Sequence, residues 1–152
     1  SIPDEHIFFC ENSAVNAILS YFSGQARTFG ITYTVSASIP KHISISETDL
    51  SILFGNLLEN AIDACNAQSG EDKKIIVRAK TDDHSLCVTI DNTFSGSLDI
   101  DQEGHFVSSK HEGLGLGTES IKSIAEKYGG VCQFEANNGM FYASVMCFKD
   151  HA

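Results

Sequence analysis

The sequence lacks a long apolar run, a surplus of cations and any closely spaced pair of cysteines. No apolar stretch approaches the roughly 18 residues that a membrane-spanning helix needs, and no segment has the pattern of a signal peptide. Ten Lys and Arg residues against twenty Asp and Glu residues give a formal net charge of −10. Because sequence-independent binding to nucleic acid needs clustered cations, we expect no nucleic-acid partner and no membrane contact by these residues themselves.

The cysteines and histidines also lack the spacing of a metal site. The five cysteines are an odd number without a CxxC pair, and no two of the six histidines form HxxxH. Most of the cysteines stand at apolar positions, so we expect reduced core thiols of a cytoplasmic protein and no zinc site. A length of 152 residues with 42% hydrophobic residues is enough for one domain with a core of its own.

Periodicity predicts three helices and five strands. The first helix begins at Asn12 or Ser13 and is stopped by Gly30, the second runs from Thr48 or Asp49 to about Asn66, and the third ends at Gly129-Gly130. The strands are expected at residues 31–39, 74–80, 85–90, 131–136 and 140–148, with hairpins at 82–83 and 137–139. This order predicts a two-layer α/β sandwich of three helices over a mixed, mostly antiparallel sheet.

Residues 92–112 show no clear period over 21 positions. A structureless loop of this length is uncommon in a compact domain. We therefore expect a functional or mobile loop there.

The second helix carries an unusual polar stripe. Asn56, Glu59, Asn60 and Asp63 fall within an arc of about 100° on a helix that is otherwise apolar, and no Lys or Arg occurs between Lys41 and Lys73. An exposed helix would normally place Lys or Glu on its solvent side. The stripe therefore predicts a polar site beside this helix, with Glu59 expected at its solvated rim.

Two further features indicate a phosphate-containing ligand. Gly113, Gly115 and Gly117 alternate just before the third helix, where backbone N–H groups and the helix N-terminus favour a polyphosphate. A flexible hinge is the alternative interpretation, and the absence of GxGxxG argues against a dinucleotide fold. Asp91, where the predicted strand ends, can accept a hydrogen bond from an exocyclic amino group such as that of adenine, although such a residue is more often part of a turn.

The order of these three features resembles a known family. "NLLENAIDA" (56–64), "IDNTF" (90–94) and "GLGLGTESIKSIAEKYGG" (113–130) resemble the N, G1 and G2 boxes of the GHKL (Bergerat) ATP-binding fold. They are most similar to the catalytic domains of peptide-quorum-sensing, AgrC-like histidine kinases of Gram-positive bacteria. The resemblance extends from about Asn12 to Phe148.

The resemblance implies roles for individual residues. Asn60 would coordinate the Mg²⁺ that bridges the phosphates of ATP, Asn56 would lie in the same pocket, Asp63 near the phosphates and Ala64 near the nucleoside. Residues 92–112 would form a lid over ATP, with His105 and His111 exposed to solvent. Lys110 would either reach the phosphates or be a solvated lysine, and both alternatives stay open. No residue is assigned as catalytic, and the expected ATP-binding set is Asn56, Asn60, Asp63, Ala64, Asp91, Lys110, Gly113, Leu114, Gly115, Leu116, Gly117 and Thr118.

Two departures from the family pattern affect the expected chemistry. Hydrolytic members place a Glu where this chain has Asn56, and an amide cannot act as the general base for water. The site is therefore expected to hold ATP for transfer to another acceptor. The G1 box, usually Asp-x-Gly-x-Gly, has Thr93 and Ser95 in place of its glycines, so we expect altered pocket walls.

We expect residues 1–152 to be a single GHKL catalytic and ATP-binding domain, a fragment of a larger membrane-anchored sensor. Its partners would be the sensor's own dimerisation hairpin, which carries the phosphoacceptor His, and indirectly a response regulator. Two alternatives stay open: an anti-sigma-factor-type Ser kinase, and a degenerate interaction module that holds nucleotide weakly or not at all.

Overall fold

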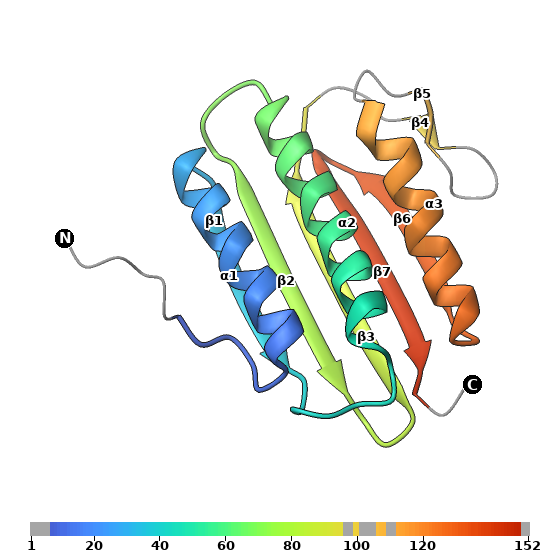
Figure 1. Cartoon of the computed structure of the whole chain (residues 1–152). Helices are drawn as coiled ribbons and strands as arrows, with labels where there is room; N and C mark the ends of the chain where they lie inside the picture. The colour runs from blue at the N-terminus through green and yellow to red at the C-terminus, as the bar shows by residue number, and fades with distance from the viewer. Residues whose placement is uncertain (1–6, 96–98, 101–105, 109–111, 150–152) are drawn as a thin grey trace.

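Three helices and seven strands make up the described chain (Figure 1). The computed structural model describes residues 7–95, 99–100, 106–108 and 112–149. The elements are α1 (Ser13–Thr28), β1 (Thr32–Ser38), α2 (Glu47–Asn66), β2 (Lys74–Thr81), β3 (Ser85–Thr93), β4 (Asp99–Ile100), β5 (Phe106–Ser108), α3 (Glu112–Lys127), β6 (Val131–Asn137) and β7 (Met140–Phe148). None of the described helices is both long enough and apolar enough to cross a membrane.

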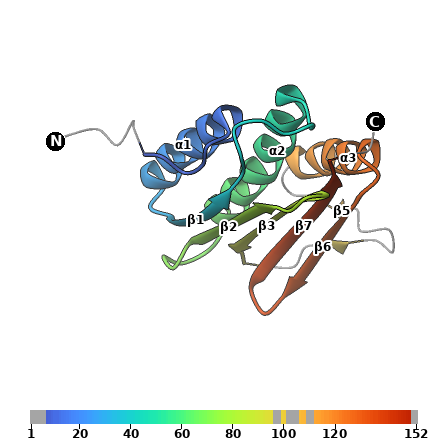
Figure 2. The ribbon, with the colours of Figure 1, turned by 90° about the horizontal axis from the view of Figure 1, so that it is seen from below.

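The five longer strands form one sheet in the order β1-β2-β3-β7-β6. β1 and β2 are parallel and are joined by a crossover through α2, whereas the other pairs are antiparallel. All three helices cover the same face of the sheet (Figure 2). The two-layer α/β sandwich with a mixed, mostly antiparallel sheet is therefore confirmed.

The core lies between the helices and this face of the sheet. Side chains alternate along the central strands, so that every second one is buried against the helices. The buried positions include Ile75, Val77, Leu86, Val88, Ile90, Phe141 and Val145 from the strands and Leu50, Leu53, Phe54, Leu57 and Leu58 from α2.

Local signals place the element ends close to the expected positions. Asn12 caps α1 by accepting a hydrogen bond from Val15 N (3.1 Å). α2 begins earlier than predicted, at Glu47, because Ser46 is the cap and its hydroxyl accepts from Asp49 N (3.1 Å). The last hairpin turns at Asn138 and Gly139, with φ values of 51° and 77°.

The prediction of a structureless loop over residues 92–112 is partly wrong. β3 extends to Thr93 because it pairs with β7 as far as Met140. β4 and β5 then form a short antiparallel pair. α3 already begins at Glu112, so Gly113, Gly115 and Gly117 lie in its first turns and not ahead of it. The intervening leucines are good helix formers, which compensates for part of the helix-destabilising effect of the glycines.

Candidate functional site

The polar stripe of α2 is divided between buried and exposed positions. Asn60 is only 8% exposed, whereas Asn56 and Asp63 are half-buried and Glu59 is exposed. Ala64, one residue further along, is buried as well. The side chain that faces most deeply into the fold is therefore the amide of Asn60.

α3 lies close to this stripe at Gly117. A Cβ atom added to Gly117 would lie 3.1 Å from Asn60 Oδ1 and 3.4 Å from Asn56 Oδ1. Asn56 Nδ2 donates a hydrogen bond to Ile52 O (2.8 Å), so the donor end of this amide is bonded within α2. The absence of a side chain at Gly117 lets the first turns of α3 lie directly against both amide oxygens.

This arrangement fits a magnesium-bound phosphate chemically. Amide oxygens are hard ligands of the kind that Mg²⁺ accepts, and Mg²⁺ takes few protein ligands because it keeps waters and phosphate oxygens. The N-terminus of α3, which contains Gly113 and Gly115, supplies backbone N–H groups and a positive dipole end. Among the described residues no group of three His, Cys, Asp or Glu side chains could hold a metal by itself.

Two predicted site positions next to Gly117 are only partly described. Leu114 and Leu116 belong to α3 by their backbone, and Thr118 is buried in the same helix. Lys110, His105 and His111 lie outside the described residues, so their predicted places remain predictions.

Asp91 is not brought together with the asparagines. It lies inside β3, opposite Ile76 and Tyr142, on the sheet face that carries no described helix. Its Oδ2 atom pairs with Arg78 Nη1 on the neighbouring strand (3.2 Å). The expectation that Asp91 marks the end of the strand was wrong, because β3 continues to Thr93.

Asn92, which the sequence reasoning missed, faces the helix layer instead. Its side chain is 2% exposed, and its Nδ2 donates to Thr93 O (3.0 Å). The same end of β3 contacts the end of α2, since Cys65 Sγ lies 3.7 Å from Thr93 O. The alternation of the strand could have identified Asn92 from the sequence. Leu86, Val88 and Ile90 share the inward face, and Asn92 is the next residue in that alternation.

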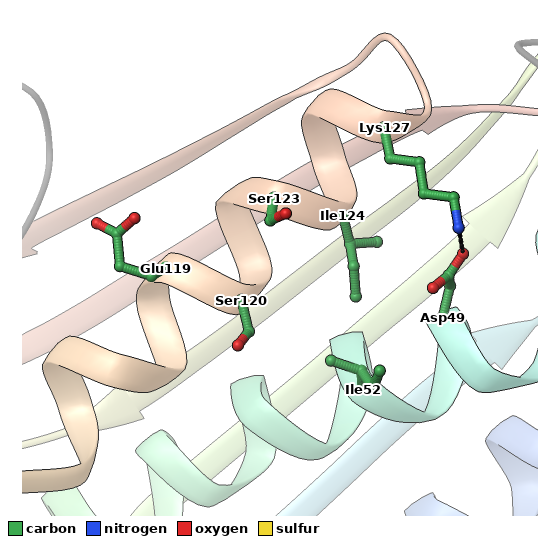
Figure 3. Close-up of a pocket in the computed structure, with 7 residues that line it drawn as sticks. All are labelled: Asp49, Ile52, Glu119, Ser120, Ser123, Ile124 and Lys127. Atoms are coloured by element: carbon green, nitrogen blue, oxygen red, sulfur yellow. Dashed lines mark hydrogen bonds and ion pairs between the residues drawn. The ribbon is translucent and has the colours of Figure 1, made fainter.

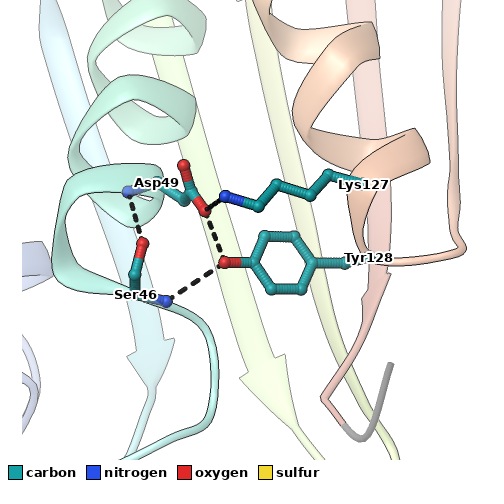
Figure 4. Close-up of polar contacts among 4 residues, drawn as sticks. All are labelled: Ser46, Asp49, Lys127 and Tyr128. Atoms are coloured by element: carbon teal, nitrogen blue, oxygen red, sulfur yellow. Dashed lines mark hydrogen bonds and ion pairs between the residues drawn. The ribbon is translucent and has the colours of Figure 1, made fainter. Parts of the chain in front are cut away.

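A second polar group joins α2 and α3 at their other ends. This group, called the Asp49 cluster, consists of Ser46, Asp49, Lys127 and Tyr128 (Figure 4). Asp49 Oδ2 accepts hydrogen bonds from Lys127 Nζ (2.8 Å) and from the Tyr128 hydroxyl. Ser46 N donates to the same hydroxyl (3.3 Å). Asp49 lies in the first turn of α2 and Lys127 in the last turn of α3, so both helix dipoles favour the pair.

These contacts hold the pKa of Asp49 below its ordinary value, chiefly through the hydrogen bond from Lys127 and then that from Tyr128. The stabilisation is therefore fully present above the unfolded-state pKa of about 3.9 and is lost as pH falls through the lower folded-state pKa.

We expect Asp49→Asn to reduce the free energy of unfolding at pH 7 by about 1–3 kcal/mol, because hydrogen bonds to a buried charge are lost. Urea unfolding at pH 7 and near pH 3 should show the difference shrinking at the lower pH. Asp91→Asn is the control, since Arg78 is largely exposed and such pairs contribute less than about 1 kcal/mol. An equal loss at both pH values would show that the charge of Asp49 is not what stabilises the fold.

A groove of about 530 Å³ lies between α2 and α3 beside the Asp49 cluster (Figure 3). Ile52 and Ile124 lie between the helices, Ser120 and Ser123 line the α3 side, and the Asp49–Lys127 ion pair closes one end. Asn56 and Asn60 are not among the residues that line this groove.

The chain is similar in sequence to a sensor kinase. A curated relative, the probable C4-dicarboxylate sensor kinase of Bacillus subtilis (strain 168), is 25% identical over 138 residues, which cover 85% of this chain and 25% of the relative. The chain therefore spans about a quarter of the length of that protein.

Solved structures share the fold. The catalytic domain of histidine kinase ThkA in a nucleotide-free form superposes with a TM-score of 0.69 at 20% identity, covering 91% of this chain and 92% of that one. The mycobacterial sensor histidine kinase MprB gives 0.68 at 17% identity, covering 92% and 96%. A sequence profile described as GHKL domain matches residues 45–147, which include α2, the sheet strands β2, β3 and β6, and α3. The chain belongs to the GHKL domain family.

Proposed function

We propose that this chain is the ATP-binding catalytic domain of a sensor histidine kinase in a two-component system. It would transfer the γ-phosphate of ATP to a histidine on a separate dimerisation hairpin. The main support for the proposal is that Gly117, near the N-terminal end of α3, lies beside the side chains of Asn56 and Asn60. Amide oxygens and a helix N-terminus together form a site suited to a magnesium-bound polyphosphate.

The named relatives support this assignment. The Bacillus subtilis protein is a probable sensor kinase, and ThkA and MprB are histidine kinases. ThkA has also been solved in complex with the response regulator TrrA. We propose that residues 1–152 form the corresponding portion of a larger sensor, with its own phosphoacceptor hairpin as direct partner and a response regulator downstream.

The chemistry of the site favours transfer over hydrolysis. Asn60 would hold Mg²⁺, which neutralises charge on the phosphates during transfer, and the N–H groups of the first turn of α3 would bind the phosphate oxygens. Asn56 is an amide and cannot remove a proton from water. An imidazole acceptor has a free lone pair at neutral pH and needs little help from a base.

The nucleobase would be recognised from β3 by Asn92 and not by Asp91. Asn92 lies on the helix side, near the end of α2, and its amide offers both an acceptor and donors. We expect Asn92→Ala to weaken ATP binding about 5- to 30-fold, because one buried hydrogen bond contributes about 1–2 kcal/mol. Asp91→Asn should leave ATP affinity within about twofold. Calorimetric titration of both variants with ATP measures the two affinities. A larger loss of affinity for Asp91→Asn than for Asn92→Ala would show that Asp91 recognises the nucleobase.

The finer assignment rests on the sequence motifs. The likeness of "NLLENAIDA" and "EKYGG" to peptide-quorum-sensing kinases supports a sensor of that type in a Gram-positive bacterium, with this domain in the cytoplasm.

Phosphotransfer provides the direct test. The chain is incubated with γ-labelled ATP and Mg²⁺, with and without the dimerisation hairpin of its own sensor. We expect slow release of free phosphate alone and acid-labile phosphoprotein once the hairpin is added. Fast phosphate release without a partner would place the protein among hydrolytic GHKL members. Acid-stable phosphoserine on an added partner protein would instead favour the anti-sigma-factor type of kinase.

A further inference from the structure

One face of α2 connects the Asp49 cluster to the asparagines. Asp49, Ile52, Asn56 and Asn60 follow one another at spacings of three, four and four residues, so they lie in one stripe along the helix. The facing stripe of α3 contains Lys127, Ile124, Ser120 and Gly117. The two helices are antiparallel (Figure 1). The cluster therefore joins one end of this interface, and Gly117 lies beside Asn56 and Asn60 at the other.

Packing on the solvent side of this interface is incomplete. Between the two ends lies the groove lined by Ile52, Ser120 and Ser123, with Ile124 buried beside it. On the sheet side Ile121 and Ala125 are buried and hold α3 on the sheet. The hydrogen bonds that Asp49 accepts from Lys127 and Tyr128 are directional contacts between α2 and the end of α3, and they help to set how closely the two helices approach on this side.

The end of α3 next to the cluster is attached independently to β7. Tyr128 O accepts a hydrogen bond from Phe148 N (2.9 Å), and Gly130 lies in close contact with the backbone of Met146. This attachment can serve as a pivot. From Lys127 to Gly117 a rigid helix extends about 15 Å, so a tilt of roughly 4° displaces the Gly117 end by about 1 Å. Because a Cβ atom added to Gly117 would lie only 3.1 Å from Asn60 Oδ1 and 3.4 Å from Asn56 Oδ1, the two helices are close there, and such a displacement alters the site.

We propose that Asp49, Lys127 and Tyr128 are positioning residues of the nucleotide site, which set the approach of Gly117 to Asn60 from the opposite end of α3. The inference rests on the proposed function for its nucleotide readout. None of the three residues would touch the nucleotide, since they act through the placement of α3.

Four variants test the proposal. Tyr128→Phe removes only the hydroxyl of a buried ring, and Lys127→Met removes the cation from a largely exposed side chain, so at least one of them should fold. Lys127→Arg keeps the charge and the donor. Val77→Ala, in the core of the sheet and away from the cluster, provides a variant destabilised without any change at the α2–α3 interface.

Two measurements are made on each variant of this chain. The first is the nucleotide-free NMR spectrum, which reports the Gly117 amide and the side-chain amides of Asn56 and Asn60. The second is the Kd for Mg·ATP. We expect Tyr128→Phe and Lys127→Met to shift these signals and raise Kd about 5- to 10-fold. Lys127→Arg should stay within about twofold of the original chain, and Val77→Ala should change neither quantity.

The inference is overturned if folded Tyr128→Phe and Lys127→Met proteins keep the original Gly117 and Asn60 signals. It is also overturned if Val77→Ala raises Kd as much as they do, because the role would then be general stability. Should the original chain fail to bind Mg·ATP, the proposed function fails, whereas the nucleotide-free spectra still decide whether the cluster positions α3.

Discussion

Replacing Asn60 with alanine should weaken Mg·ATP binding by about 10- to 100-fold without unfolding the protein. Hydrogen bonds or ligand contacts to a charged group contribute about 1.5–3 kcal/mol, which corresponds to this range. The fold should survive because alanine is the better helix former and the lost amide faces Gly117 and the site, not the core. Calorimetry gives the affinity and circular dichroism the fold.

Glu59→Ala is the matched control for Asn60→Ala. It is the adjacent residue on the same helix, it is exposed, and its removal should change affinity less than about twofold. If Asn60→Ala unfolds the chain, the amide is structural. If it binds Mg·ATP as tightly as the original chain, Asn60 is not a ligand of the metal.

Gly130→Ala should destabilise the fold far more than a methyl group added at Gly24 or Gly55. A Cβ atom at Gly130 would lie 1.7 Å from Met146 O and 2.7 Å from Met146 C, so one backbone would have to move away from the other. Because overpacking alone costs about 1–3 kcal/mol and backbone atoms cannot rotate away, we expect a loss of roughly 3–5 kcal/mol. For a domain of this size the melting temperature should fall by roughly 10–15 °C.

Gly24→Ala is the control for this loss. Gly24 lies within α1, and nothing stands within 4 Å of a Cβ atom added there. Alanine in a helix interior should raise stability by about 0.5–1 kcal/mol. Thermal unfolding of both variants measures the contrast. A Gly130→Ala protein as stable as Gly24→Ala would mean that the turn between α3 and β6 does not contact β7 as the structure has it.

The fold followed from periodicity because its signals are local. The helical spacing of apolar residues, the cap at Asn12 and the turn at Asn138-Gly139 each act within a few residues, and the structure confirms all three. The end of β3, in contrast, is not determined by local signals. Its last residues are held by pairing with β7, which lies about fifty residues away in the chain, so no local pattern marks their end.

The site was harder to predict for the same reason. Asp91 and Asn92 are neighbours in β3, and a strand places neighbouring side chains on opposite faces of the sheet. A prediction that ends the strand before Asp91 therefore misses that Asn92, and not Asp91, lies on the helix side. The closeness of Gly117 to Asn60 depends on how α3 packs on α2, which sequence spacing alone does not specify. The Asp49 cluster joins residues nearly eighty positions apart and has no signature in the sequence.

Titrating the chain with Mg·ATP while following backbone and side-chain amide signals by NMR tests the central claim most directly. We expect saturation with a Kd between about 1 µM and 1 mM, or roughly −8 to −4 kcal/mol. The side-chain amides of Asn56, Asn60 and Asn92 and the backbone amide of Gly117 should shift most, whereas Arg78 and Asp91 on the opposite sheet face should not shift. An absence of saturation at millimolar nucleotide would rule out this nucleotide site and favour a degenerate interaction module. Saturable shifts confined to the Arg78 and Asp91 face would show that nucleotide binds elsewhere on the domain.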